Sequence, residues 1–135
     1  MPHLVVEYSA NLAERVDIDS LLGDLHQAAV ATGVFELGAV RTRGVVRHHY
    51  VVADDAEDNA FAHVTVRIGA GRDEATKQQL ADALFAAVCG SLEEVHRTSP
   101  LAISFEVQEI EPTLSRRWNN LHERVVAHPV EGSRA

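Results

Sequence analysis

The segment His3-Leu4-Val5-Val6-Glu7-Tyr8 predicts a β-strand that decides the fold, because a helix and a second strand follow it and the whole pattern then recurs. Apolar residues repeat at helical spacing over residues 18–32. Asp17 is placed to cap the start of this helix and Gly33 to end it. Residues 39–43 predict the second strand, so the first half of the chain is strand, helix, strand.

The second half of the chain repeats this order. Its predicted elements are a polar loop at residues 53–59, a strand at 61–68, a turn at 69–71, a helix from about 73 up to Pro100, and a strand at 101–110. Between the halves, residues 45–52 either continue the second strand or form a neighbouring one. The chain therefore contains two β-α-β repeats.

Two such repeats predict an α+β fold, a mixed sheet with both helices on one face, because right-handed crossovers make the strands of each unit parallel. We expect a single domain at residues 1–124 and a C-terminal tail at residues 125–135. The sheet face without helices carries mostly polar side chains, which a monomer leaves in water and an oligomer can cover. They include His63, Thr65, Arg67, Ser104, Glu106 and Gln108.

Composition excludes several classes of partner. The 135 residues suffice for one domain with a substantial core, and the formal charge of −8 argues against nucleic acid or an anionic membrane as a general partner. The single cysteine, Cys89, excludes an internal disulfide, and no apolar run is long enough to span a membrane. No secretion signal precedes the first strand, so we expect a cytoplasmic protein.

Pro2 changes its chemistry if Met1 is removed. Within a chain the proline nitrogen is a non-basic amide, whereas at a free terminus it is a secondary amine that can accept and return a proton. A strand that begins at once would hold this amine in a fixed place, whereas a frayed terminus would not. Pro2 is therefore a candidate acid/base group.

Arginines are the other candidates for a site. Arg41 and Arg43 lie on one face of the second strand, and Arg72 follows the turn after the third, in a chain that is otherwise acidic. Guanidinium groups hold carboxylates in a two-point geometry, although pairing with the protein's own acidic side chains is an alternative role. The histidine spacings match no metal-ligand pattern, so we expect no metal site.

An ordered set of motifs resembles the 5-carboxymethyl-2-hydroxymuconate isomerase family, a member of the tautomerase superfamily. The similarity runs from Pro2 to about His122. Its motifs are Pro2, Ala31-Thr32-Gly33-Val34-Phe35, Arg41-Thr42-Arg43, Ile68-Gly69-Ala70-Gly71-Arg72, Ser104-Phe105-Glu106, Pro112-Thr113-Leu114 and Asn119-Asn120-Leu121-His122.

This resemblance implies a tautomerase-like homotrimer that catalyses a keto–enol isomerisation without cofactor or metal. It implies that Pro2, freed of Met1, is the catalytic acid/base, and that Arg41 and Arg72, with Arg43, bind substrate carboxylates. The implied substrate is a dienol with three carboxylates from the bacterial breakdown of homoprotocatechuate, so the activity would be that of a delta-isomerase.

Two other functions remain open from the sequence. A ferredoxin-like module that binds a small ligand would share the two β-α-β units, and Pro2 would have no role in it. A tautomerase-fold enzyme could act instead on another 2-hydroxydienoate or 2-keto acid, or by hydration. The sequence also leaves open whether Arg116-Arg117-Trp118 forms a structural lid or only packs against the domain.

Overall fold

The computed structural model describes residues 1–127 and contains a four-stranded sheet with the order β2-β1-β3-β4. The strands are β1 (Pro2–Ser9), β2 (Arg41–Arg47), β3 (Ala60–Gly69) and β4 (Leu101–Ile110). β1 pairs with β2 and β3 with β4 in parallel, whereas β1 and β3 are antiparallel. The predicted mixed sheet of two β-α-β repeats is confirmed.

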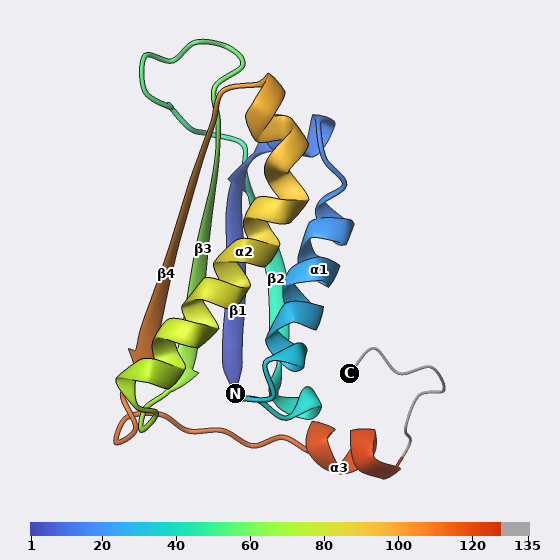
Figure 1. The fold of residues 1–135 in the computed structure, drawn as a ribbon, viewed down its shortest axis with the longest axis vertical. Coiled ribbons are helices and arrows are strands. Elements are labelled where there is room, and N and C mark those ends of the chain that lie inside the picture. Colours follow the sequence, from blue (N-terminus) through green and yellow to red (C-terminus); the bar gives the residue numbers. More distant parts are fainter. Residues whose placement is uncertain (128–135) are drawn as a thin grey trace.

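Two long helices, α1 (Ile18–Ala31) and α2 (Glu74–Thr98), cover the same face of this sheet (Figure 1). Each begins at an aspartate whose side chain accepts hydrogen bonds from the first-turn backbone, Asp17 for α1 and Asp73 for α2. A third helix, α3 (Leu121–Ala127), and two short 3₁₀ helices, η1 (Ala10–Glu14) and η2 (Leu37–Ala39), complete the described elements.

The core lies between the sheet and the two long helices, because alternate strand residues point toward them. Each fully buried leucine there stabilises the fold by about 1.5–3 kcal/mol relative to an exposed one. The buried strand residues include Leu4, Val6, Ala62, Val64, Val66 and Ile68, and the helices contribute Leu21, Leu25, Leu80, Leu84, Val88 and Leu92. His26 on α1 also contacts β2, with its Nδ1 2.8 Å from the Thr42 hydroxyl.

The opposite, open face of the sheet carries polar and charged side chains. Glu7 of β1 and Arg47 of β2 form an ion pair there at 2.5 Å, and His63 of β3 contacts Glu106 of β4 at 2.8 Å. The first contact joins β1 to β2 and the second joins β3 to β4.

The sequence left open whether residues 45–52 continue the second strand or form a neighbouring strand, and the structure matches neither alternative in full. β2 ends at Arg47, which pairs with Ser9, the last residue of β1, and residues 48–59 are loop. Residues 45–52 therefore neither continue the strand throughout nor form a new one, because beyond Ser9 the chain turns into η1 and leaves no partner.

The domain boundary predicted at residues 124 and 125 falls within α3, and residues 128–135 of the predicted tail lie outside the described residues. The boundary itself stays a prediction. Among residues 1–127, no helix is both long enough and apolar enough to cross a membrane.

Candidate active site

All four strands have one end at the edge of the sheet where the chain starts. β1 and β2 begin there and β3 and β4 end there, because Pro2 pairs with Ile68 and His3 with Arg41, while Gly69 pairs with Ile110. The N-terminus lies at this edge in Figure 1. Pro2 itself is buried, so the strand holds the start of the chain in place, as the sequence predicted.

Positive charge surrounds the chain terminus. The pKa of the Met1 amine is lowered, first by its partial burial and then by the charges of Arg117, Arg41 and Arg72. Glu36 acts in the opposite direction and is the weakest of these causes. The terminal amine therefore lies where its neutral, proton-accepting form is favoured.

The protein backbone fixes Arg41 and Arg72, two of the three arginines singled out from the sequence. Arg41 donates from Nη1 to the Ala39 carbonyl oxygen at 2.7 Å, and Arg72 donates from Nη1 to the Gly69 carbonyl oxygen at 3.0 Å. The Arg72 guanidinium also lies over the Phe35 ring, 5.1 Å from its centroid. Both side chains are half-buried and keep further N–H groups for a ligand.

Arg43 has a different environment. It is exposed on the open face, where its Nη1 lies 3.1 Å from Nδ1 of His3. The pKa of His3 is lowered, first by burial and next by the charge of Arg43. Arg43 is not among the charges that shift the pKa of the terminal amine, so only Arg41 and Arg72 of the predicted trio act on the chain start.

The sequence did not predict the role of Arg117 at this site. It lines an open pocket of about 360 Å³ together with Met1, Gly69 and Ile110. Its charge is also the largest electrostatic cause of the lowered pKa of the Met1 amine. The signal available in the sequence was a pair of arginines after Pro112 in an acidic chain, which alone did not separate a binding role from packing.

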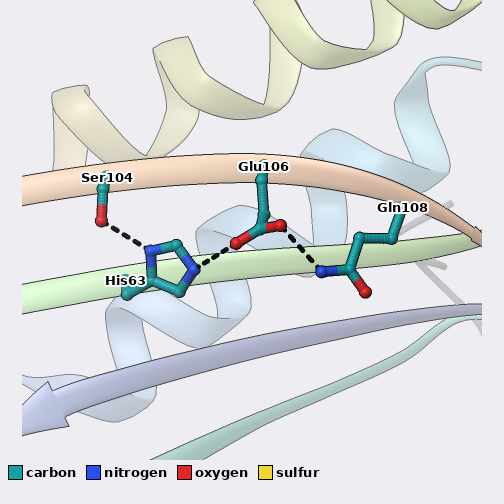
Figure 2. A network of polar contacts seen from close by, with 4 residues as sticks. All are labelled: His63, Ser104, Glu106 and Gln108. Atoms are coloured by element: carbon teal, nitrogen blue, oxygen red, sulfur yellow. Dashed lines mark hydrogen bonds and ion pairs between the residues drawn. The ribbon is translucent and has the colours of Figure 1, made fainter.

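A second polar cluster lies on the open face, where β3 and β4 run side by side (Figure 2). His63 contacts the Ser104 hydroxyl through Nδ1 at 2.6 Å and Glu106 through Nε2 at 2.8 Å, and Gln108 donates to Glu106 at 2.7 Å. These contacts lower the pKa of Glu106, with Gln108 the largest cause. The cluster joins β3 to β4.

No metal site is evident in the part of the chain that the structure describes. Within residues 1–127, no group of three or more histidine, cysteine or acidic side chains is arranged to hold a metal ion. The charged groups that the described residues place around the chain start are the terminal amine, Arg117, Arg41, Arg72 and Glu36.

Comparison with known proteins identifies the family. The model of the 5-carboxymethyl-2-hydroxymuconate isomerase family matches residues 2–125. The 5-carboxymethyl-2-hydroxymuconate Delta-isomerase of Escherichia coli is 36% identical over 122 residues, which cover 90% of this chain and 97% of that protein.

Solved structures agree with this assignment. The crystal structure of a 5-carboxymethyl-2-hydroxymuconate isomerase from Deinococcus radiodurans R1 has a TM-score of 0.84 and 35% identity, covering 91% of this chain and 92% of that one. A fused 4-OT solved as a symmetric trimer shares the fold at a TM-score of 0.60 and 23% identity, over 93% of this chain and 99% of that one.

The resemblance predicted from the sequence motifs is confirmed, and with it the prediction of an isomerase. The α+β fold expected for a tautomerase is confirmed as well. The chain belongs to the 5-carboxymethyl-2-hydroxymuconate isomerase family, within the tautomerase superfamily.

Proposed function

We propose that this protein is a cofactor-independent keto–enol isomerase that converts 5-carboxymethyl-2-hydroxymuconate into its 2-oxo isomer, with the amine of Pro2 as general acid/base after removal of Met1. The observation that carries this proposal is the position of Pro2, which is buried at the start of β1 and paired with Ile68. It lies next to the Met1 amine, whose pKa Arg117, Arg41 and Arg72 lower. The family and its relatives' names support the substrate class.

The reaction moves one proton and leaves the electron count unchanged. The neutral Pro2 amine takes the proton of the 2-hydroxyl, the oxygen forms a carbonyl, and the double bonds shift along the diene. The resulting ammonium then returns the proton to the carbon at the far end. One group that accepts and then donates suits this task when its pKa lies near the working pH.

The charges around the amine serve two purposes in this mechanism. They disfavour the ammonium form and so keep the base neutral in the free enzyme. Arg41 and Arg72 also bind carboxylates of the substrate and stabilise negative charge that develops on the 2-oxygen in the transition state. Backbone contacts already orient both guanidinium groups, so less conformational freedom is lost on binding. Arg43 is proposed as a third carboxylate ligand.

We also propose that the protein works as a homotrimer in the cytoplasm, in the breakdown of aromatic acids such as homoprotocatechuate. Related tautomerase folds have been solved as symmetric trimers. The charged open face and the edge strands β2 and β4 give each subunit surfaces that such an assembly can cover. Neither nucleic acid nor a membrane is a proposed partner.

The ultraviolet decay of 5-carboxymethyl-2-hydroxymuconate tests the proposed function. Protein whose mass confirms the loss of Met1 is expected to accelerate ketonisation, and Pro2→Ala is expected to lower kcat by about 10²- to 10⁴-fold. Arg41→Ala and Arg72→Ala are expected to lower kcat/KM by at least about tenfold each, because each removes a charged contact to substrate.

No acceleration by the processed protein, with this substrate or with other 2-hydroxydienoates, would remove the isomerase mechanism. Turnover of a different 2-hydroxydienoate alone would keep Pro2 as base and correct the substrate.

A further inference from the structure

The segment that carries Arg117 crosses the sheet edge at the chain start. We call residues 111–120, which connect β4 to α3, the strap. Figure 1 shows the strap passing beneath the N-terminus. Strap residues and Met1 together line two pockets, of about 360 and 410 Å³.

Both ends of the strap are anchored. One end continues from Ile110, which pairs with Gly69 in the sheet. The other end leads into α3, where Nδ1 of His122 lies 3.2 Å from the Glu36 carboxylate beside η2. The sheet at one end and α3 at the other therefore hold the strap, with its side chains, near the amine.

The two neighbouring arginines of the strap differ in what they contact. Arg116 donates from Nη1 to the carbonyl oxygens of Thr113 and Ser115, at 3.1 and 3.3 Å. Arg117 makes no hydrogen bond or ion pair with any residue of the described range 1–127, although it carries the strongest charge effect on the amine. Its guanidinium keeps all five N–H donors for a ligand.

The arginines near the amine lie on two sides of it. Arg41 begins β2, on one side of β1. Arg72 contacts both the Phe35 ring after α1 and the Gly69 carbonyl oxygen at the end of β3. Arg117 lines the pocket on the other side, with Gly69 and Ile110 at the ends of β3 and β4. A ligand bound across the amine would therefore meet cations at both of its ends.

From this arrangement we infer that Arg117 is a substrate-binding residue, which holds a carboxylate at the end of the dienol far from the 2-hydroxyl. This inference rests on the proposed function for the identity of the substrate. Arg41 and Arg72 take the end next to the 2-hydroxyl, and the Pro2 amine works between the two ends. Arg117 thus makes the enzyme select dienols with a carboxylate at each end.

Direct binding tests this inference without turnover. We would titrate Met1-free protein calorimetrically with trans,trans-muconate, a diene with a carboxylate at each end, and with sorbate, a diene with one. Neither probe has a 2-hydroxyl, so neither can be ketonised. Wild-type protein is expected to bind muconate at least about tenfold more tightly, because the second carboxylate gains a charge-assisted hydrogen bond.

Variants of Arg117 and of its neighbour Arg116 separate the contribution of Arg117 from a general loss of positive charge. Arg117→Gln is expected to weaken muconate binding about tenfold and to leave sorbate binding within about twofold, while Arg117→Lys keeps part of the preference. Arg116→Gln is the matched control, since it removes the neighbouring charge, and it is expected to keep the preference.

Four results would overturn the inference. They are no preference for muconate in the wild type, an unchanged preference in Arg117→Gln, an equal loss for both probes in that variant, and the same loss of preference in Arg116→Gln. Failure of the proposed function has a different signature, since it appears as absent ketonisation even where the muconate preference is intact.

Discussion

The Arg72 guanidinium lies over the ring of Phe35, with its central carbon 5.1 Å from the ring centroid. The two residues belong to different halves of the chain, since Phe35 follows α1 and Arg72 follows β3. The Gly69 carbonyl oxygen holds the same guanidinium at 3.0 Å. One β-α-β unit therefore orients an arginine of the other, which we propose binds a substrate carboxylate.

Replacing Phe35 by leucine should weaken substrate binding. Leucine keeps an apolar side chain at this buried position but removes the aromatic face, which contributes about 0.5–2 kcal/mol to a neighbouring cation. We expect KM to rise about three- to tenfold with a smaller change in kcat, as measured by steady-state kinetics. Phe85→Leu is the control, because Phe85 packs on Phe105 away from the site. Equal effects of both substitutions would contradict the role of Phe35.

Gly38 permits the close approach of η2 and α3. A Cβ on Gly38 would lie 2.6 Å from Cα of His122, which is backbone and cannot rotate away. Gly38→Ala should displace α3 and the strap, and so reduce kcat/KM by at least about tenfold through Arg117.

The matched control for this prediction is Gly90→Ala. Gly90 lies within α2 and has no neighbouring atom within 4 Å of the added Cβ. That substitution should stabilise the protein by about 0.5–1 kcal/mol, because alanine favours a helix over glycine, with unchanged kinetics. Normal activity in Gly38→Ala would show that the strap position does not matter.

Removing the charge of Arg117 should move the pH profile of the reaction. In the proposed mechanism the neutral Pro2 amine is the base, so we expect kcat/KM to fall as the pH drops through the pKa of that amine. Arg117 helps to lower the pKa of the Met1 amine, second only to burial, so we expect its loss to raise the pKa of the Pro2 amine next to it. We expect the acidic limb of the profile to shift to higher pH in Arg117→Gln and to stay in place in Arg116→Gln. A shift to lower pH would contradict this electrostatic role.

The cluster in Figure 2 predicts a change in the titration of Glu106. Gln108 is the largest cause of the lowered pKa of this carboxyl, followed by His63, so Gln108→Leu should raise that pKa toward its ordinary value of 4.5. A lowered carboxyl pKa stabilises the fold at pH values above the pKa of the unfolded state, and this stabilisation is lost as the pH falls through the pKa of the folded state. In Gln108→Leu the stabilisation should be smaller, and its loss on acidification should begin at a higher pH. Carbon-13 NMR of the carboxyl groups measures the titration, and denaturant unfolding at a series of pH values measures the stability.

Glu111 gives an internal control in the same spectra. Thr113 lowers the pKa of Glu111, so this carboxyl should titrate identically in both proteins. An unchanged titration of Glu106 in Gln108→Leu would contradict the hydrogen bond.

The sequence predicted the strands and helices closely where apolar residues recur at a regular spacing. Alternation identified β4 at residues 101–110, and the predicted cap Asp17 is confirmed. The second helix begins beside Asp73, close to its predicted start. The end of β2 was not predictable in this way, since β-branched residues continue beyond Arg47 and only the end of β1 stops the pairing. Strand length there is set by the neighbouring strand.

The sequence predicted those residues of the site that lie at strand ends, but not the one on the irregular strap. Arg41 and Arg72 lie at strand ends, and the repeat brings those ends to one edge of the sheet. Arg117 lies on the aperiodic strap, whose path depends on the tertiary contact of α3 with η2. No local pattern in the sequence encodes that contact, so the third arginine near the amine emerged only from the structure.

The processing of Met1 gives the most direct test of the central claim that the Pro2 amine is the acid/base. Two samples, shown by mass to retain or to lack Met1, would be compared in the ketonisation of 5-carboxymethyl-2-hydroxymuconate. With Met1 retained, the Pro2 nitrogen is an amide, so we expect kcat/KM to be about 10²- to 10⁴-fold lower. Comparable turnover by the two samples would contradict the account.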